Sequence, residues 1–123
     1  MYYFDALTLP AYTLEDAALI LTIPLDNGVI DFLEVEYPAG CAGLVYAKVT
    51  YNTIQIIPYN PGGWLRGDNR IFKASIDYEV KDPPYEIKLW GYNLDDTYPH
   101  TISMGINFIH GVRAVDISKL LEV

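Results

Sequence analysis

The side chains most able to do chemistry in this 123-residue sequence are its two histidines, His100 and His110. They lie at the two ends of one predicted strand, about 30 Å apart at roughly 3.3 Å per residue, so they cannot share a metal ion. His100 follows a loop that contains Asp95 and Asp96, and a contact between this histidine and an aspartate would be either half of a catalytic site or an ordinary loop hydrogen bond. Because no nucleophile motif, P-loop, zinc-protease motif or dinucleotide fingerprint accompanies them, we predict that the protein is not an enzyme.

A second group of residues carries the hard oxygen atoms that calcium prefers, namely Asn93, Asp95, Asp96 and Asp68. Their spacing lacks the glycine and the distal glutamate of an EF-hand loop. Since Asn and Asp stabilise turns without a metal, we predict a solvated hairpin tip, with no metal and no cofactor. Cys41 is the only cysteine, which excludes an intrachain disulfide, and we expect it to pack near a turn.

Aromatic residues are the strongest candidates for a binding surface, since they make up 14% of the chain and include 11 tyrosines. Trp90 and Tyr92 lie on the opposite face of a predicted strand from Ile87 and Leu89, and Tyr98 follows that strand. If this face is exposed, its rings form a platform that could stack on sugars. If it is covered, the same rings belong to the core or to a subunit interface.

The longest irregular segment begins at Asn60-Pro61-Gly62-Gly63 and runs to about Asn69. Trp64 and Arg66 in this segment are residue types that often dominate binding at protein interfaces, and Tyr59 immediately precedes it. We therefore predict either a connection that joins two sheets or a contact between subunits.

Period-two alternation of apolar and polar residues predicts the secondary structure, as in the segments 72–80 and 102–108. Pro, Gly, Asn and Asp separate the alternating runs at short, regular intervals. The pattern predicts an all-β antiparallel β-sandwich, jelly-roll-like, and an additional pairing around residues 6–9 would bring the strand number to eight. The expected strands are 17–24, 29–37, 43–51, 53–58, 70–80, 85–93 and 100–109.

The two ends of the chain differ from the middle and suggest three parts. We predict an N-terminal arm over 1–16, a β-sandwich domain over 17–110, and a short helical or extended C-terminal tail over 111–123. Apolar side chains at both ends would be buried by exchange between subunits, at roughly 25 cal/mol per Å². The expected interface residues at the ends are Tyr2, Tyr3, Phe4, Leu120 and Leu121, in addition to Tyr59, Trp64 and Arg66.

The net charge of the chain indicates which classes of partner it is not expected to bind. Eight Lys and Arg against 16 Asp and Glu give a formal net charge of −8, which argues against binding to nucleic acid or to an anionic membrane surface. The N-terminus lacks the basic segment of a signal peptide, so we expect synthesis in a cytoplasm.

The resemblance to a known family rests on three stretches, namely 34–41, 59–68, and 82–85 followed by 93–101. They resemble small β-sandwich proteins among the structural proteins of tailed bacteriophages and related viruses. The resemblance implies a non-enzymatic virion component, such as a capsid decoration, vertex, turret, tail or fibre protein, made in the host cytoplasm. Its partners would be further copies of itself and other virion proteins. A carbohydrate-binding β-sandwich module that recognises a surface glycan is the alternative.

Overall fold

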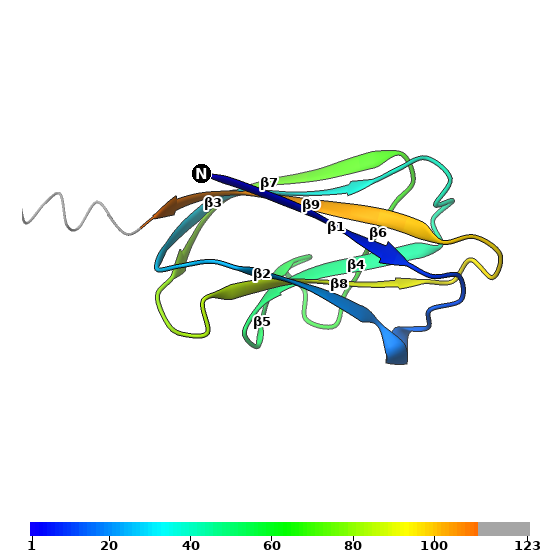
Figure 1. Cartoon of the computed structure of the whole chain (residues 1–123), viewed down its shortest axis with the longest axis horizontal. Coiled ribbons are helices and arrows are strands. Elements are labelled where there is room, and N and C mark those ends of the chain that lie inside the picture. The colour runs from blue at the N-terminus through cyan, green and yellow to red at the C-terminus, as the bar shows by residue number, and fades with distance from the viewer. Residues whose placement is uncertain (111–123) are drawn as a thin grey trace, which may run out of the picture.

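Alternating apolar and polar residues form two antiparallel β-sheets, which face each other in the computed structural model (Figure 1). The structure describes residues 1–110, so the predicted tail, with Leu120 and Leu121, lies outside the described residues. Sheet A contains, in spatial order, β1 (Tyr2–Leu9), β9 (His100–His110), β3 (Gly28–Tyr37) and β7 (Arg70–Val80). Sheet B contains β2 (Leu19–Pro24), β8 (Glu86–Asn93), β4 (Val45–Tyr51) and β5 (Ile54–Ile57), and the short β6 (Leu65–Arg66) also pairs with β4.

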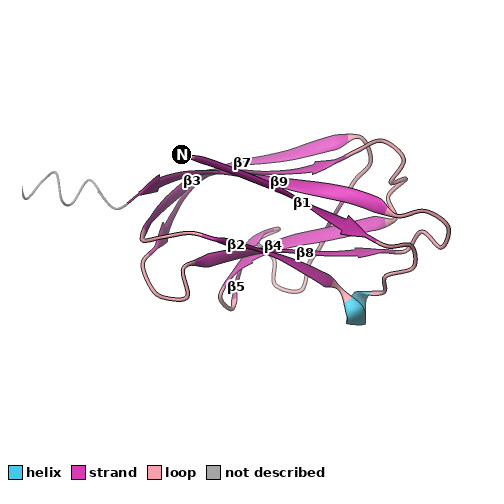
Figure 2. Ribbon diagram, in the orientation of Figure 1, coloured by secondary structure: helices cyan, strands magenta, loops and turns pink. Residues whose placement is uncertain are grey.

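The strand order is that of a jelly roll, and it confirms the predicted all-β antiparallel sandwich. The chain passes from one sheet to the other after every strand except β4 and β5, so strands that are distant in sequence become neighbours. Apart from the short β6, each sheet has four strands, and two four-stranded sheets connected in this way are typical of jelly rolls. Figure 2 shows that nearly all of the regular secondary structure is β-strand. The single helical element among residues 1–110 is the short 3₁₀ turn η1 (Glu15–Ala17).

The core lies between the sheets and contains every second residue of each long strand. On β9, the side chains of Ile102, Met104, Ile106 and Phe108 are fully buried, as the alternation predicts. The inward faces of β3 and β7 are also as predicted, since the polar residues that alternate with the core residues lie on the outer face of sheet A. Cys41 is fully buried in the turn between β3 and β4, which confirms its predicted packing role.

Residues 2–9 are not an arm outside the sandwich, which corrects the prediction for residues 1–16, whereas the additional pairing expected around residues 6–9 is confirmed. Residues Tyr2–Leu9 form β1, which pairs along its whole length with β9, from Tyr2 opposite Asn107 to Leu9 opposite His100. Leu9 is fully buried in the core. The segment joins the sheet because β9 would otherwise present an unpaired hydrogen-bonding edge.

The side chain of Tyr3, which the sequence suggested as an interface residue, points inward. Its ring packs on Phe108, with centroids 6.2 Å apart, and its hydroxyl lies 3.1 Å from the His110 Nε2 atom. Tyr2 and Phe4 lie on the opposite face of β1 and are 50% and 59% exposed. The alternation of strand faces therefore divides the three aromatic residues between core and surface.

Tyr2 crosses the central strand of sheet A over a glycine. A Cβ atom at Gly105 would overlap the Tyr2 hydroxyl, so the absence of a side chain there lets the ring lie flat against β9. The hydroxyl then donates a 2.6 Å hydrogen bond to Glu34 on β3. This bond to the carboxylate, together with burial and the negative charge, raises the pKa of Tyr2 to about 12.

Candidate ligand-binding groove

The outer face of sheet B carries a row of large side chains across neighbouring strands. Lys48 on β4 is directly opposite Trp90 on β8, and Trp64 immediately precedes β6 on the other side of β4. The Lys48 Nζ atom lies 4.4 Å from the centroid of the Trp64 ring and 5.2 Å from that of the Trp90 ring. The ammonium group therefore makes cation–π contacts with both indoles and holds them on either side of it.

A second aromatic cluster lies one step along the same strands. The rings of Tyr46 and Tyr92 stack with centroids 4.6 Å apart, and Trp64 meets Tyr92 edge to face at 4.7 Å. Arg66 donates a 3.0 Å hydrogen bond to the Tyr46 hydroxyl. Burial is the main cause that raises the pKa of Tyr92, and the nearby negative charge of Glu15 adds to it.

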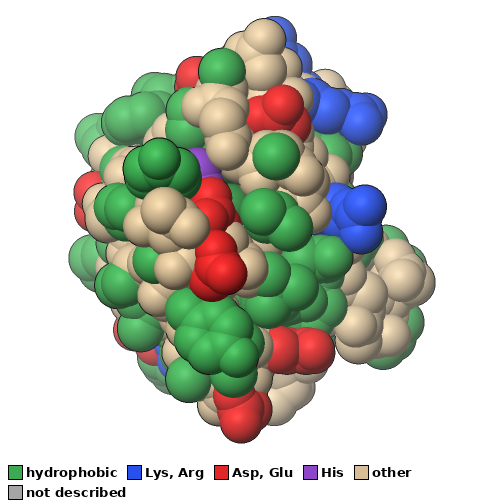
Figure 3. Space-filling model, turned by 90° about the vertical axis from the view of Figure 1, so that its right-hand side faces the viewer, with side chains coloured by type: hydrophobic (Ala, Val, Ile, Leu, Met, Phe, Trp, Pro, Cys, Tyr) green, Lys and Arg blue, Asp and Glu red, His purple; other side chains and the backbone are tan. Residues whose placement is uncertain are grey.

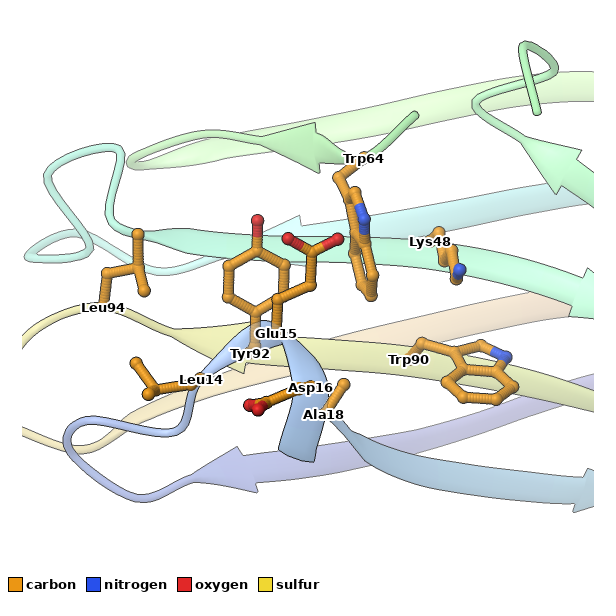
Figure 4. Close-up of a pocket in the computed structure, with 9 residues that line it drawn as sticks. All are labelled: Leu14, Glu15, Asp16, Ala18, Lys48, Trp64, Trp90, Tyr92 and Leu94. Atoms are coloured by element: carbon orange, nitrogen blue, oxygen red, sulfur yellow. The ribbon is translucent and has the colours of Figure 1, made fainter. Parts of the chain in front are cut away.

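A groove of about 770 Å³ opens between these rings and the 3₁₀ turn η1 (Figure 4). In the view of Figure 4 the Glu15 carboxylate lies between the Tyr92 ring and the Trp64 indole. The groove therefore combines aromatic walls with one ammonium group and two carboxylates. Its lining residues are Leu14, Glu15, Asp16, Ala18, Lys48, Trp64, Trp90, Tyr92 and Leu94.

The loop before β6 is held in place by a single side chain, and this loop positions Trp64. The Gln55 amide donates hydrogen bonds to the carbonyls of Pro58 and Gly63, at 2.7 and 2.9 Å, and lies 3.0 Å from that of Asn60. A Cβ atom at Gly63 would overlap the Asn60 side chain, which would have to move to make room for it. The segment then crosses to sheet A, which confirms the predicted connection between sheets.

One end of the sandwich, which faces the viewer in Figure 3, gathers loops that are far apart in the sequence. The Gly40 amide donates to the Asp68 carboxylate at 2.9 Å, the Asn69 amide donates to the Pro38 carbonyl, and the Leu94 amide donates to the Leu44 carbonyl. Stretches that are far apart in sequence thus meet in space. Figure 3 shows hydrophobic side chains on this end around a group of acidic ones.

The predicted contact between His100 and an aspartate is present at the same end. The His100 Nε2 atom lies 2.8 Å from the Asp95 Oδ2 atom. The other Asp95 oxygen accepts the amide hydrogens of Thr97 and Tyr98. The hydrogen bond with His100 is the main cause that lowers the pKa of Asp95, so the stabilisation it provides is present at neutral pH and is lost as the pH falls through this lowered pKa.

Asn93 organises this loop from inside the protein. Its amide nitrogen donates to the carbonyls of Leu9 and Tyr98, at 3.2 and 3.0 Å, and lies 3.3 Å from that of Pro10. Its oxygen accepts the Asp95 amide hydrogen at 2.9 Å. The oxygen atoms that the sequence offered to calcium are therefore engaged in turn hydrogen bonds. Among residues 1–110, no cluster of three or more His, Cys, Asp or Glu side chains has the arrangement of a metal site.

The structure brings together only some of the candidate site residues. Trp90 and Tyr92 share the groove with Trp64, whereas Tyr98 lies in the β8–β9 loop and does not line it. Arg66 lies beside the groove on Tyr46. Tyr59 is 84% exposed in the loop after β5.

Sequence reasoning missed Lys48 and Glu15, which give the groove its charge. The alternation of Tyr46, Lys48 and Thr50 with three small apolar residues of β4 was the available signal for Lys48. Glu15 had no such signal, because its position depends on how η1 folds over β8. Tyr46 was not predicted as a site residue either, since the segment 43–51 was interpreted as apolar on both faces.

No protein-family model and no curated protein sequence matches this chain. In the described part of the chain, no helix has both the length and the apolar character needed to cross a bilayer. The functional argument therefore depends on the surfaces of the sandwich themselves.

Proposed function

We propose that this protein is a non-enzymatic structural component of a virion, which assembles into a homo-oligomer through the outer face of sheet A. The observation that carries the proposal is the exposure of apolar side chains on that face. Tyr2 and Phe4 are 50% and 59% exposed, and Ile71 at the far edge of the same face is 44% exposed. Adjacent exposed aromatic residues of this kind are typical of protein interfaces.

The proposed contact uses the face of the sheet and not its edge. Asp5 on β1 accepts the backbone hydrogen of Ala6 at 2.8 Å. This bond occupies an amide that points away from β9, and a charged side chain at an edge opposes the addition of another strand. Edge-to-edge pairing at β1 is therefore disfavoured, and the face with Tyr2 and Phe4 is left as the surface that a second copy can cover.

The resemblance, the fold and the net charge are the support for the virion part of the proposal. Two of the stretches that resemble phage structural proteins contact each other through Gly40 and Asp68, whereas residues 82–85 of the third lie at the opposite end of the sandwich, where the Leu25 amide donates to the Tyr85 carbonyl. Jelly rolls recur in viral capsid domains, which is an analogy at the level of the fold and also holds for lectins. The net charge of −8 limits non-specific binding to nucleic acid during assembly.

We expect the protein to associate reversibly and the variant Phe4→Ser to weaken that association at least about tenfold. The reason is that full burial of a Phe side chain in an interface contributes about 1.5 to 3 kcal/mol. Light scattering over a dilution series measures the solution mass of each protein. Ile54→Ser is the matched control, since Ile54 is 50% exposed on sheet B, away from the proposed interface. A wild-type mass of 13.9 kDa at every concentration, or equal effects of the two variants, would contradict the proposal.

We also expect the chain to be a constituent of assembled particles. Virus particles purified from a lysate by density-gradient centrifugation should contain it in a fixed ratio to the major capsid protein, as measured by quantitative mass spectrometry. Repeated gradients should not lower this ratio. A chain that remains in the soluble fraction would argue against the virion role, whatever its oligomeric state.

A further inference from the structure

We propose that the groove on sheet B, between η1 and the side chains of Lys48, Trp64 and Trp90, binds a neutral oligosaccharide. The groove lies on a different sheet from the proposed assembly face, so this inference does not depend on the assembly proposal. Both indoles are half-buried, which fixes their positions and leaves part of each ring accessible. Flat aromatic surfaces of this kind pack well against the apolar faces of sugar rings.

The charges around the groove select for a ligand without net charge. Lys48 lies between the two indoles and already occupies the position that a ligand cation would take over these rings. Glu15 and Asp16 line the opposite side and repel an anion. A cationic ligand over the indoles would therefore be repelled by Lys48, and an anionic ligand would be repelled by the two carboxylates.

The hydrogen-bonding capacity of the groove matches hydroxyl groups. An ammonium group only donates hydrogen bonds, and an ionised carboxylate only accepts them. A hydroxyl group does both, so a sugar with several adjacent hydroxyls can accept from Lys48 and donate to Glu15 at once. Because both protein groups are charged, these hydrogen bonds are stronger than those between neutral partners.

A proline-rich peptide is the main neutral competitor, since such peptides also dock in aromatic grooves. Its carbonyl groups would need hydrogen-bond donors from the groove. The Trp90 Nε1 hydrogen is already donated to the Thr50 Oγ1 atom at 2.8 Å, so this donor is engaged within the protein. The carboxylates of Glu15 and Asp16 offer a proline-rich chain only acceptors, and proline lacks an N–H to donate to them.

The size and rigidity of the groove also suit an oligosaccharide. Its volume of about 770 Å³ lies within the range of small-molecule sites and exceeds what one or two water molecules need. Trp90 is fixed by its bond to Thr50, and Trp64 is fixed by its edge-to-face contact with Tyr92. A preformed site loses little conformational entropy when a ligand binds, which favours affinity.

The test is a titration of the full-length protein with a defined panel of ligands, followed by tryptophan fluorescence and by calorimetry. The panel contains neutral gluco-, galacto-, manno-, xylo- and chito-oligosaccharides, an anionic oligogalacturonate, and a proline-rich peptide. We expect saturable binding of at least one neutral oligosaccharide. The Trp64→Ala variant should weaken it at least about tenfold, because truncation of a central aromatic residue typically has an effect of that size.

Glu15→Gln is the second variant, because Glu15 is exposed and its replacement should leave the fold unchanged. It should weaken binding of the same saccharide about tenfold, as expected for the loss of a charged hydrogen-bond acceptor. Glu36→Gln, on the outer face of sheet A, makes the same charge change away from the groove and should alter the affinity by less than about twofold. The inference is overturned if no neutral saccharide reaches saturation at a ligand concentration of about 10 mM, which is roughly the largest dissociation constant of interest. It is also overturned if Glu15→Gln and Glu36→Gln have equal effects, or if only the anionic saccharide or the peptide binds.

Discussion

The variant Asn93→Asp is expected to lower the free energy of unfolding by about 3 kcal/mol or more at pH 7. Asn93 is fully buried, and its amide nitrogen donates to carbonyls that come from the end of β1 and from the β8–β9 loop. An ionised carboxylate has no hydrogen to donate and would place a negative charge against these carbonyl oxygens. The site thus loses its donor and gains electrostatic repulsion within a buried region.

This destabilisation should depend on pH in a defined direction. Burial and the surrounding carbonyls raise the pKa of the introduced carboxyl in the folded state above its value in the unfolded chain. The penalty is therefore full at neutral pH and shrinks as the pH falls through this raised pKa, because the protonated carboxyl is neutral and can donate. Urea unfolding of the variant and the wild type at pH 7 and pH 5 measures the difference at each pH.

Asp96→Asn serves as the control for Asn93→Asp. Asp96 is exposed in the same loop and bonds only locally to the Thr97 hydroxyl at 2.9 Å. Its replacement should change the free energy of unfolding by less than about 0.5 kcal/mol. If Asn93→Asp were as mild as this control, the amide of Asn93 would not join the loop to β1 in the way its hydrogen bonds indicate.

The variant Phe108→Ala should lower the free energy of unfolding by about 3 to 5 kcal/mol, which corresponds to a fall in Tm of roughly 15 °C. Phe108 lies on the central strand β9 with no exposed surface, and its ring contacts those of Tyr3 and His110. Truncation would remove these contacts and leave a cavity, because β9 is paired on both sides and cannot collapse into the space.

Ile109→Ala is the matched control for Phe108→Ala, since Ile109 is the next residue on the same strand and is 47% exposed on the outer face. We expect it to cost less than about 1 kcal/mol. Differential scanning calorimetry measures both variants. Similar losses at the two positions would mean that the inward and outward faces of β9 are not divided as the structure shows.

The exposed aromatic residues of β1 and the groove on sheet B offer two independent surfaces. Assembly through Tyr2 and Phe4 would leave the groove open, since the two surfaces lie on the outer faces of different sheets. A particle protein with both properties could hold its place in the assembly by one face and present a sugar-binding site with the other. The mass measurement and the saccharide titration test these properties separately.

Much of the strand structure follows from the sequence alone, because the faces of a strand alternate at every residue. The segments 70–80 and 100–109 illustrate this: the alternation predicts β7 (Arg70–Val80) and β9 (His100–His110) and identifies which side chains face the core. The composition also indicates an antiparallel sandwich, since Pro, Gly, Asn and Asp recur between runs that are too short for anything but strands. The contact between Asp95 and His100 could be expected too, because both residues lie in one loop.

The sequence suggested a pairing around residues 6–9, but neither the full strand over residues 2–9 nor its partner could be predicted in this way. Residues 2–9 lack a regular apolar alternation, and their incorporation into sheet A depends on the free edge of β9, a strand about 100 residues later. The pairing of sequence-distant strands is a property of the fold, because local preferences specify that a segment is extended but not which segment it joins. The separation of Tyr3 from Tyr2 and Phe4 is a consequence of that pairing.

The groove was likewise decided by tertiary structure. The sequence indicated Trp64, Trp90 and Tyr92 as aromatic candidates, but Lys48 and Glu15 come from strands and turns that have no sequence relation to them. Lys48 reaches the indoles because β4 pairs with β8 on one side and with β6 on the other. Glu15 reaches Tyr92 because η1 follows the crossover from sheet A to sheet B. The sequence alone therefore determined which face is apolar for strands with a clear alternation, such as β7 and β9. The arrangement of the strands determined which side chains meet, since contacts between distant segments arise only when the sheets have formed.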